Sequence, residues 1–282
     1  MAKRKTAKKS SKPIPYKTIL FGIFCLLFIY TTYHYRHGLN YWWKTIERKF
    51  GTKKHSYSNT NHNIQLTKYD LRNIELMDRY YLDTFGLDVS QYQGEINWSQ
   101  MKTIYDIYPI NFTFIRATMG SFNTDKRYIE NWKESKKNGF LRGAYHFYRP
   151  DENSTAQAQN FIEHVKLETG DLPPVLDIET TPRNQPMERL VEGLKNWCAI
   201  IENHYGIKPI IYTSDKYHQD YLIQHFEGYV IWIANYNFFV EKMQPHWNIW
   251  QFTEKAQIKG TREKVDLNIY RGTVDELKNL TL

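Results

Sequence analysis

The sequence predicts an α/β fold, an irregular TIM-like (β/α)5(β)3 barrel, preceded by a single N-terminal transmembrane helix. Eight short runs rich in β-branched and aromatic residues recur from Phe85 onward, which is typical of strands. The first five runs are centred roughly 30 residues apart and the last three about 20 apart, whereas a parallel crossover with its helix needs a dozen or more connecting residues. Helices therefore fit only the early gaps. An open doubly wound sheet is the alternative, but it does not predict this change of spacing.

The N-terminal region predicts a membrane anchor. Residues 1–17 carry seven Lys or Arg and no acid, and the following segment, residues 18–36, contains about eighteen consecutive residues without Lys, Arg, Asp or Glu. No small-residue cleavage site follows the apolar run, which favours an uncleaved anchor over a signal peptide. The excess of positive charge on the N-terminal side predicts a cytoplasmic tail. We therefore expect a single-pass protein of the plasma membrane or cell inner membrane, with its folded domain on the outer, periplasmic or cell-wall, side.

The charge distribution argues against a nucleic-acid partner. The whole chain has a formal charge of +8, but residues 1–17 and 36–54 contribute roughly +12, which leaves the remainder near −4. A groove that follows phosphates needs Lys and Arg on the folded part, and here they are concentrated before it. Residues 37–80, with the polar stretch "HSYSNTNHN", are expected to be a juxtamembrane stalk, and residues 81–282 the barrel.

The strands and helices are predicted in the following order. The expected strands are 85–90, 112–118, 141–148, 173–180, 207–214, 229–236, 247–253 and 265–270. Helical periodicity covers 98–108, 128–139 and 188–206, and the last two segments end at Gly139 and Gly206, typical C-terminal caps. The connections 237–246 and 254–264 are too short or too polar for a packed helix.

Four acidic residues interrupt these strands. Asp177 and Glu179 in "PPVLDIET" are two positions apart, so they point to the same face, and the end of a barrel strand opens on the active-site mouth. Asp88 and Asp266 repeat the pattern in the first and last strands, which become neighbours when a barrel closes. Carboxyls that converge repel one another, so one of them should hold a proton at neutral pH. A protonated carboxyl beside ionised ones is what glycosidic bond cleavage requires.

Each of these acids, considered alone, has another interpretation. A single acid at a strand end more often belongs to a helix cap or pairs with an arginine, whereas four acids on strands of one barrel favour a site. A magnesium site would also need a basic cluster for substrate phosphates, and the folded part has none. We expect no metal and no cofactor.

Aromatic residues recur at the same strand ends. Flat apolar faces with polar edges suit sugar rings, although about half of such residues are expected in the barrel core. The candidates for substrate binding are Tyr145, Tyr212, Trp232, Trp250 and the adjacent Gln251. His146 is expected to be a hydrogen-bonded interior residue rather than a base.

The ordered motifs "GLDVSQYQGEINW", "GAYHFYRP", "PPVLDIE", "IYTS", "IWIANY", "WQFT" and "VDLNIY" resemble the glycoside hydrolase family 25 lysozymes, the Chalaropsis-type muramidases, over roughly residues 84–273. The resemblance implies a distorted barrel that hydrolyses the β-1,4 bond between N-acetylmuramic acid and N-acetylglucosamine in peptidoglycan. Glu179 would be the proton donor, and Asp177 would steer the 2-acetamido group of the substrate. Asp88 and Asp266 would tune the acid and hold substrate or water.

The resemblance leaves some alternatives open. An inverting reaction with a water held by an aspartate competes with the substrate-assisted reaction. Where many relatives have an acid after "AT", this chain has Met119, so this part of the rim could bind sugar differently. The expected partner is the glycan strand of peptidoglycan, with no obligate protein partner. The alternative function is an inactive peptidoglycan-binding envelope protein.

Overall fold

The computed structural model describes residues 21, 22, 24–28, 30, 31 and 66–282. The predicted basic tail 1–17 lies outside the described residues, and so do most of the predicted transmembrane segment 18–36 and residues 37–65 of the predicted stalk. In the part of the chain that is described, no helix has both the length and the apolar character needed to cross a bilayer. The described residues 66–282 belong to one compact unit.

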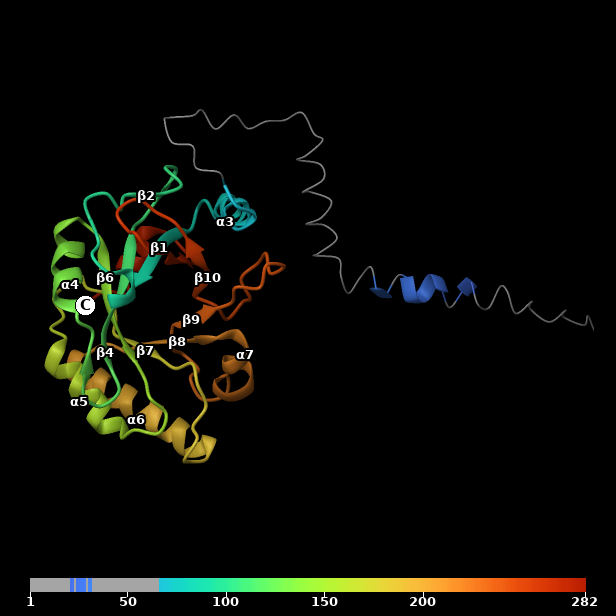
Figure 1. The fold of residues 1–282 in the computed structure, drawn as a ribbon. Coiled ribbons are helices and arrows are strands. Elements are labelled where there is room, and N and C mark those ends of the chain that lie inside the picture. The colour runs from blue at the N-terminus through green and yellow to red at the C-terminus, as the bar shows by residue number, and fades with distance from the viewer. Residues whose placement is uncertain (1–20, 23, 29, 32–65) are drawn as a thin grey trace, which may run out of the picture. The chain divides into compact units, whose positions relative to one another are not determined.

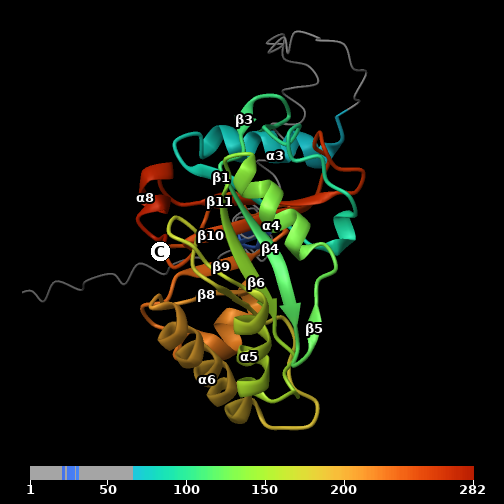
Figure 2. The same cartoon turned by 90° about the vertical axis from the view of Figure 1, so that its left-hand side faces the viewer.

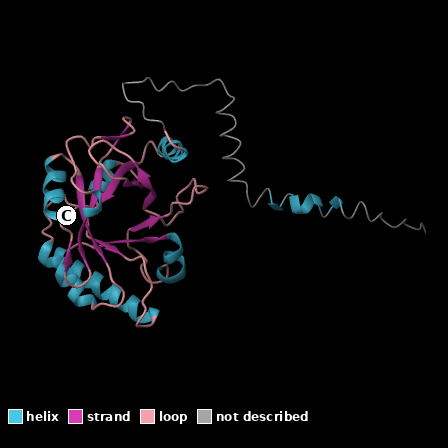
Figure 3. Ribbon diagram, viewed as in Figure 1, coloured by secondary structure: helices cyan, strands magenta, loops and turns pink. Residues whose placement is uncertain are grey.

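Eight strands close into a barrel, and all eight coincide with predicted strands (Figures 1 and 3). They are β1 (Thr84–Val89), β4 (Phe112–Met119), β6 (Leu141–Phe147), β7 (Val175–Asp177), β8 (Ile210–Ser214), β9 (Ile231–Ala234), β10 (Ile249–Ala256) and β11 (Val265–Tyr270). Their order around the barrel is β1-β11-β10-β9-β8-β7-β6-β4, and a parallel pairing of β4 with β1 closes it. The short strand β5 (Asn123–Thr124) pairs in antiparallel fashion with the last two residues of β4.

One strand runs against the others. β11 is antiparallel to both of its neighbours, β1 and β10, while the remaining neighbours around the barrel are parallel. The start of β11 therefore lies at the same rim as the ends of the parallel strands. Asp266, the second residue of β11, is the direct register partner of Asp88 near the end of β1.

Helices cover part of the outside of the barrel (Figure 2). They are α4 (Tyr128–Lys137), α5 (Ser154–His164), α6 (Met187–Tyr205), α7 (Asp215–Tyr217), which continues into a π-helical turn (His218–Leu222), and α8 (Val274–Lys278). α6 ends as predicted at Gly206, whose φ of 73° is in the left-handed region that favours glycine. The connections 237–246 and 254–264 contain no helix, as expected, and residues 254–256 extend the strand β10.

The predicted helix over 98–108 is wrong. This segment forms turns and a small hairpin of β2 (Thr103–Ile104) and β3 (Tyr108–Pro109), and Tyr105 and Asp106 between them have φ values of 51° and 61°. A right-handed helix cannot contain such residues. Trp98, Met101, Ile104 and Tyr108 are nevertheless buried, so the periodicity identified most of the buried face but not the backbone conformation.

The predicted stalk also needs correction. Its last residues form the helix α3 (Lys68–Arg79), which begins with a capping box between Thr67 and Asp70. Ile74, Leu76 and Met77 of this helix are buried in the main hydrophobic core. The folded unit therefore begins before residue 81, and α3 is part of it.

The barrel interior is filled by large residues opposite small ones. Phe112 and Phe114 of β4 point inward with Tyr212 and Trp232. The neighbouring strands β1 and β6 have glycine beside these rings, and a Cβ atom at Gly86 would lie 2.5 Å from the ring of Phe112. These rings fill the interior below the rim, and a cavity lies at the carboxyl ends of the parallel strands.

Candidate active site

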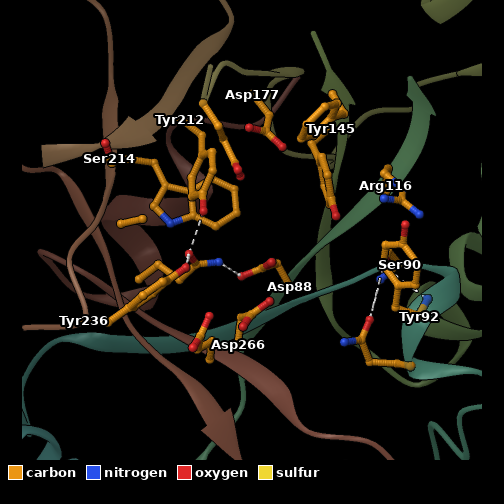
Figure 4. A pocket seen from close by; sticks show the side chains of 17 residues that line it. Asp88, Ser90, Tyr92, Arg116, Tyr145, Asp177, Tyr212, Ser214, Tyr236 and Asp266 are labelled. Carbon is orange, nitrogen blue, oxygen red and sulfur yellow. Dashed lines mark hydrogen bonds between the residues drawn. The ribbon is translucent and has the colours of Figure 1, made fainter. Parts of the chain in front are cut away.

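The four predicted acids meet in one cavity at the rim (Figure 4). Asp88 comes from β1, Asp266 from β11, Asp177 from the end of β7, and Glu179 from two residues beyond Asp177. The cavity has a volume of about 440 Å³. It is also lined by Ser90, Tyr92, Gln93, Arg116, Tyr145, Phe147, Tyr212, Ser214, Trp232, Ala234, Tyr236, Gln251 and Glu254.

Asp88 is held by two side-chain amides. Its Oδ2 accepts hydrogen bonds from Nε2 of Gln251 at 2.7 Å and from Nδ2 of Asn268 at 2.8 Å. Burial raises the pKa of Asp88 to about 6, and the amide hydrogen bonds act in the opposite direction because they stabilise the carboxylate.

Aromatic side chains orient these two amides. Oε1 of Gln251 accepts hydrogen bonds from the hydroxyls of Tyr212, at 2.7 Å, and Tyr236, which leaves Nε2 to donate to Asp88. Oδ1 of Asn268 accepts from Nε1 of Trp232 at 2.8 Å. The carboxylate of Asp88 is therefore the end point of two hydrogen-bonded chains that start at aromatic residues.

Asp266 holds a proton beside Asp88. Burial, followed by the negative charge of Asp88 and a hydrogen bond with it, raises the pKa of Asp266 to about 9. Asp88 has two amide donors that favour its ionised form, so at neutral pH the charge resides on Asp88 and the proton on Asp266.

Asp177 and Glu179 differ in their surroundings. Asp177 is 4% exposed, and among the described residues its Oδ1 has no hydrogen-bond partner. Burial raises the pKa of Asp177 well above its ordinary value, the charges of Glu179 and Asp88 raise it further, and Arg116 opposes the increase.

Glu179 is exposed at the mouth and makes no hydrogen bond or ion pair with any residue that the structure describes. The surrounding cavity still desolvates it, and this effect, followed by the charge of Asp88, raises the pKa of Glu179. A carboxyl that solvent and ligand can reach, and that holds its proton to higher pH than usual, can act as a general acid.

The structure adds Arg116, which the sequence reasoning missed. It is the only Lys, Arg or His among the described residues that line the cavity. Its Nε donates to Oδ2 of Asp125 at 2.9 Å, and its Cζ lies 4.8 Å from the ring centre of Tyr92. A signal was present, because Arg116 alternates with Phe112 and Phe114 on one strand and so shares their inward face.

Three of the predicted aromatic residues line the cavity, and they are Tyr145, Tyr212 and Trp232. Trp232 is only 2% exposed and packs 4.7 Å from Phe114, so it forms part of the floor. Two further tyrosines were not predicted. Tyr92 is 72% exposed and Tyr236 is 41% exposed, and both belong to segments that follow strands.

Trp250 does not reach the cavity, so its assignment to substrate binding was wrong. Neighbouring residues of a strand point to opposite faces, and Gln251 occupies the inner one. Trp250 is fully buried on the outer side, 5.7 Å from Trp247 and 6.3 Å from Tyr80. Its Nε1 donates to the carbonyl oxygen of Asn235 at 2.9 Å.

His146 is an interior residue, as predicted. Its ring nitrogens contact Oγ1 of Thr118 at 2.7 Å and Oε1 of Gln157 at 3.1 Å, and burial lowers the pKa of His146 to about 4. It lies outside the set of residues that line the cavity. Within the described part of the chain, no group of three or more His, Cys, Asp or Glu side chains is placed to hold a metal ion.

Known proteins resemble this chain in sequence and in structure. The family profile described as Glycosyl hydrolases family 25 matches residues 87–261. The uncharacterized protein YegX of Escherichia coli (strain K12) is 34% identical over 199 residues, which cover 68% of this chain and 71% of YegX. Lysozyme M1 of Streptomyces globisporus is 29% identical over 208 residues, covering 68% and 69% of the two chains.

Among solved structures, a family 25 glycosyl hydrolase from Bacillus anthracis superposes with a TM-score of 0.64. It is 28% identical in sequence, and the match covers 80% of this chain and all of the other.

Proposed function

The chain belongs to glycosyl hydrolase family 25, and from this premise we propose that it is a membrane-anchored lysozyme that cleaves peptidoglycan. It is a glycoside hydrolase, and its matched relatives include Lysozyme M1 of Streptomyces globisporus and the N,O-diacetylmuramidase of Arthroderma benhamiae. The bond to be hydrolysed is the β-1,4 bond between N-acetylmuramic acid and N-acetylglucosamine.

The observation that carries the proposal is the position of Glu179 at the mouth of a cavity that Asp88, Asp177 and Asp266 also line. Glu179 donates its proton to the glycosidic oxygen as the bond between this oxygen and the anomeric carbon breaks. The negative charge on Asp88 stabilises the positive charge that develops on the sugar. The carboxylate left on Glu179 then takes a proton from the water that adds to the anomeric carbon.

Asp177 orients the substrate. An unpartnered buried oxygen costs free energy, so Oδ1 of Asp177 is suited to accept a hydrogen bond that the substrate supplies. The N–H of the 2-acetamido group is such a donor. Accepting it turns the acetamido carbonyl oxygen toward the anomeric carbon, where it forms a bond as the leaving oxygen departs. The water that later adds to the anomeric carbon breaks this bond and restores the acetamido group. Asp266, which keeps its proton at neutral pH, limits the charge next to Asp88.

The anomeric configuration of the first product tests this route. The substrate-assisted reaction retains the configuration, and an inverting reaction through a water held by an aspartate would reverse it.

Sugar rings have suitable contact surfaces in the cavity. Tyr145 and Tyr212 contribute aromatic surface from within, and the exposed rings of Tyr92 and Tyr236 lie at the edge. A cavity of about 440 Å³ lies within the range of about 300–1,000 Å³ typical of ligand sites. Arg116, which is paired with Asp125, adds a positive charge to the cavity lining that lowers the pKa of Asp177.

We also propose that residues 18–36 hold the enzyme in the plasma membrane or inner membrane, with residues 1–17 in the cytoplasm and the barrel outside. The basic tail and the uncharged run that follows it support this topology. The full chain should stay in the membrane fraction after alkaline extraction, whereas a chain lacking residues 1–36 should be released. Equal release of both would contradict the anchor.

Hydrolysis is tested on insoluble peptidoglycan. The full chain in detergent should lower the turbidity of the suspension and release new reducing ends. If the protein sediments with the glycan but no reducing ends appear, it is a binding protein and the proposed reaction is wrong.

A further inference from the structure

The helix α3 is hydrogen-bonded to the loop that follows β9. We call residues 236–243 the Tyr236 loop, because its first residue lines the catalytic cavity. α3 lies beside β10 (Figure 1), and residues from its middle and its C-terminal end bond to this loop. The family profile starts at residue 87, so α3 lies outside the matched segment.

Arg72 makes the central contacts. Its side chain is almost fully buried, and its three guanidinium nitrogens donate to four backbone carbonyl oxygens. Nη2 bonds to the carbonyls of Asn237 at 3.0 Å and Val240 at 3.2 Å, and Nε bonds to that of Phe238 at 3.2 Å. Nη1 bonds to the carbonyl of Phe252 in β10 at 2.9 Å. One charged side chain thus joins three loop carbonyls to a barrel strand.

Two further residues form hydrogen bonds with the last part of the loop. Arg79 donates to the carbonyl oxygen of Glu241 and to its carboxylate, each at 3.0 Å. The hydroxyl of Tyr80 accepts a hydrogen bond from the backbone N–H of Met243 at 2.7 Å. α3 and the residue that follows it therefore contact the loop at both of its ends.

Trp250 packs against both Arg72 and Tyr80. Its ring centre lies 5.9 Å from Cζ of Arg72 and 6.3 Å from the ring of Tyr80, and its indole N–H bonds to Asn235 just before the loop. The ring of Trp250 thus packs against α3 and does not line the cavity.

The loop matters for the site through Tyr236. The hydroxyl of Tyr236 donates to Oε1 of Gln251, and Nε2 of Gln251 donates to Asp88. A change in the position of the loop would remove one of the two hydroxyls that fix the amide of Gln251, and would also move an aromatic ring at the cavity edge.

We propose that α3 is a clamp on the Tyr236 loop, and that Arg72 is a positioning residue that acts through Tyr236 and Gln251 on the catalytic carboxyls. Arg72 contacts neither substrate nor reacting atoms. The inference deepens the proposed function, because it gives α3, which precedes the segment that the family profile matches, the role of holding one wall of the same site.

The test is a double-mutant cycle in the full-length chain, with reducing ends released from peptidoglycan as the readout. Arg72→Lys keeps the charge but cannot reach four carbonyls, and kcat/KM should fall roughly tenfold. Tyr236→Ala, which removes both the hydroxyl and the ring, should cause a loss at least as large. The double variant should be no worse than Tyr236→Ala alone, because both changes act through one side chain.

Matched controls separate the clamp from general destabilisation. Arg142 is another buried arginine, which bonds to Asp171 and to the carbonyl of Trp132 on the other side of the molecule. Arg142→Lys should keep the kcat/KM of the folded protein. If Arg72→Lys does not fold, Tyr80→Phe replaces it, with Tyr205→Phe as its control, because the Tyr205 hydroxyl bonds to the carbonyl of Val165 far from the loop.

Amide hydrogen exchange makes the clamp testable even without activity. Residues 237–243 should exchange faster in Arg72→Lys, or in Tyr80→Phe, than in the wild type and the matched control. Unchanged exchange, or losses of kcat/KM that multiply in the double variant, would overturn the clamp. An inactive wild-type protein with the expected exchange would instead refute the proposed reaction and leave the clamp standing.

Discussion

Replacing Glu179 with glutamine separates catalysis from folding. Glu179 is exposed and makes no hydrogen bond or ion pair with the described residues, so Glu179→Gln removes no native contact. Surface substitutions of this kind change the free energy of unfolding by about 0.5 kcal/mol or less, and because the pKa of Glu179 is raised, the change at neutral pH should be a gain. For a domain of this size, that corresponds to a change in Tm of about 1–2 °C.

The loss of activity should be much larger. A positioned general acid typically contributes about 10²–10⁴-fold to the rate. At about 1.36 kcal/mol per tenfold, the barrier should rise by about 2.7–5.4 kcal/mol. Because the pKa of Glu179 is raised, a larger fraction of its carboxyl is protonated at the pH of the assay. Glutamine has no such proton to donate, so the whole contribution of the general acid to the rate is lost.

The assay compares two substrates with different leaving groups. Peptidoglycan has a sugar alkoxide leaving group that needs a proton, whereas an N-acetylated aryl glycoside with a nitrophenolate leaving group does not. Glu179→Gln should lose about 10²–10⁴-fold on peptidoglycan but far less on the aryl glycoside. Equal losses on both substrates would show that Glu179 acts through its charge, and full activity on peptidoglycan would remove it from the mechanism.

Three further predictions concern the carboxyl pair and the barrel interior. Asp266→Asn should raise Tm, and more at pH 8 than at pH 4. The folded-state pKa of Asp266 is raised to about 9, so the stability that this carboxyl contributes is complete below about pH 4 and is lost as pH rises toward 9; calorimetry that shows the larger gain at pH 4 would contradict the assignment. Gln251→Met should lower kcat/KM at least about tenfold, since a hydrogen bond to a charged group contributes about 1.5–3 kcal/mol, and unchanged kinetics would mean that Asp88 does not need the amide. Gly86→Ala should destabilise the fold by about 1–3 kcal/mol in chemical denaturation, because the added Cβ would meet the ring of Phe112 at 2.5 Å; wild-type stability would show that the ring can move.

The sequence predicted the barrel and its acids because both depend on local patterns. Eight runs of β-branched and aromatic residues mark the strands, and each acid interrupts such a run. The reversed direction of β11 could not be predicted, since a strand has the same residue pattern in either direction. Asp266 still reached the rim because it lies at the start of this strand.

Other errors have equally specific causes. The apolar spacing of residues 98–108 fits a helix, but two positive φ values produce a hairpin that buries the same side chains. Trp250 and Gln251 are adjacent, and alternation allows only one of them to face the cavity. Tyr236 lies beyond a strand end, where alternation no longer applies.

The helix α3 was hidden within the expected stalk. The polar stretch before it suggested a continuous linker, although Thr67 and Asp70 form a capping box that marks a helix start. Its contacts with the Tyr236 loop join residues more than 160 positions apart, as in the bond from Arg72 to Asn237. Such pairings follow from the folded arrangement and leave no local pattern.

The most direct measurement is the identity of the new reducing-end sugar after digestion of purified peptidoglycan by the full-length protein. Borohydride reduction and mass spectrometry of the products should find reduced N-acetylmuramic acid, and Glu179→Gln should produce almost none. Reduced N-acetylglucosamine, or no new reducing ends with correctly folded protein, would contradict cleavage of this bond by the carboxyl cluster.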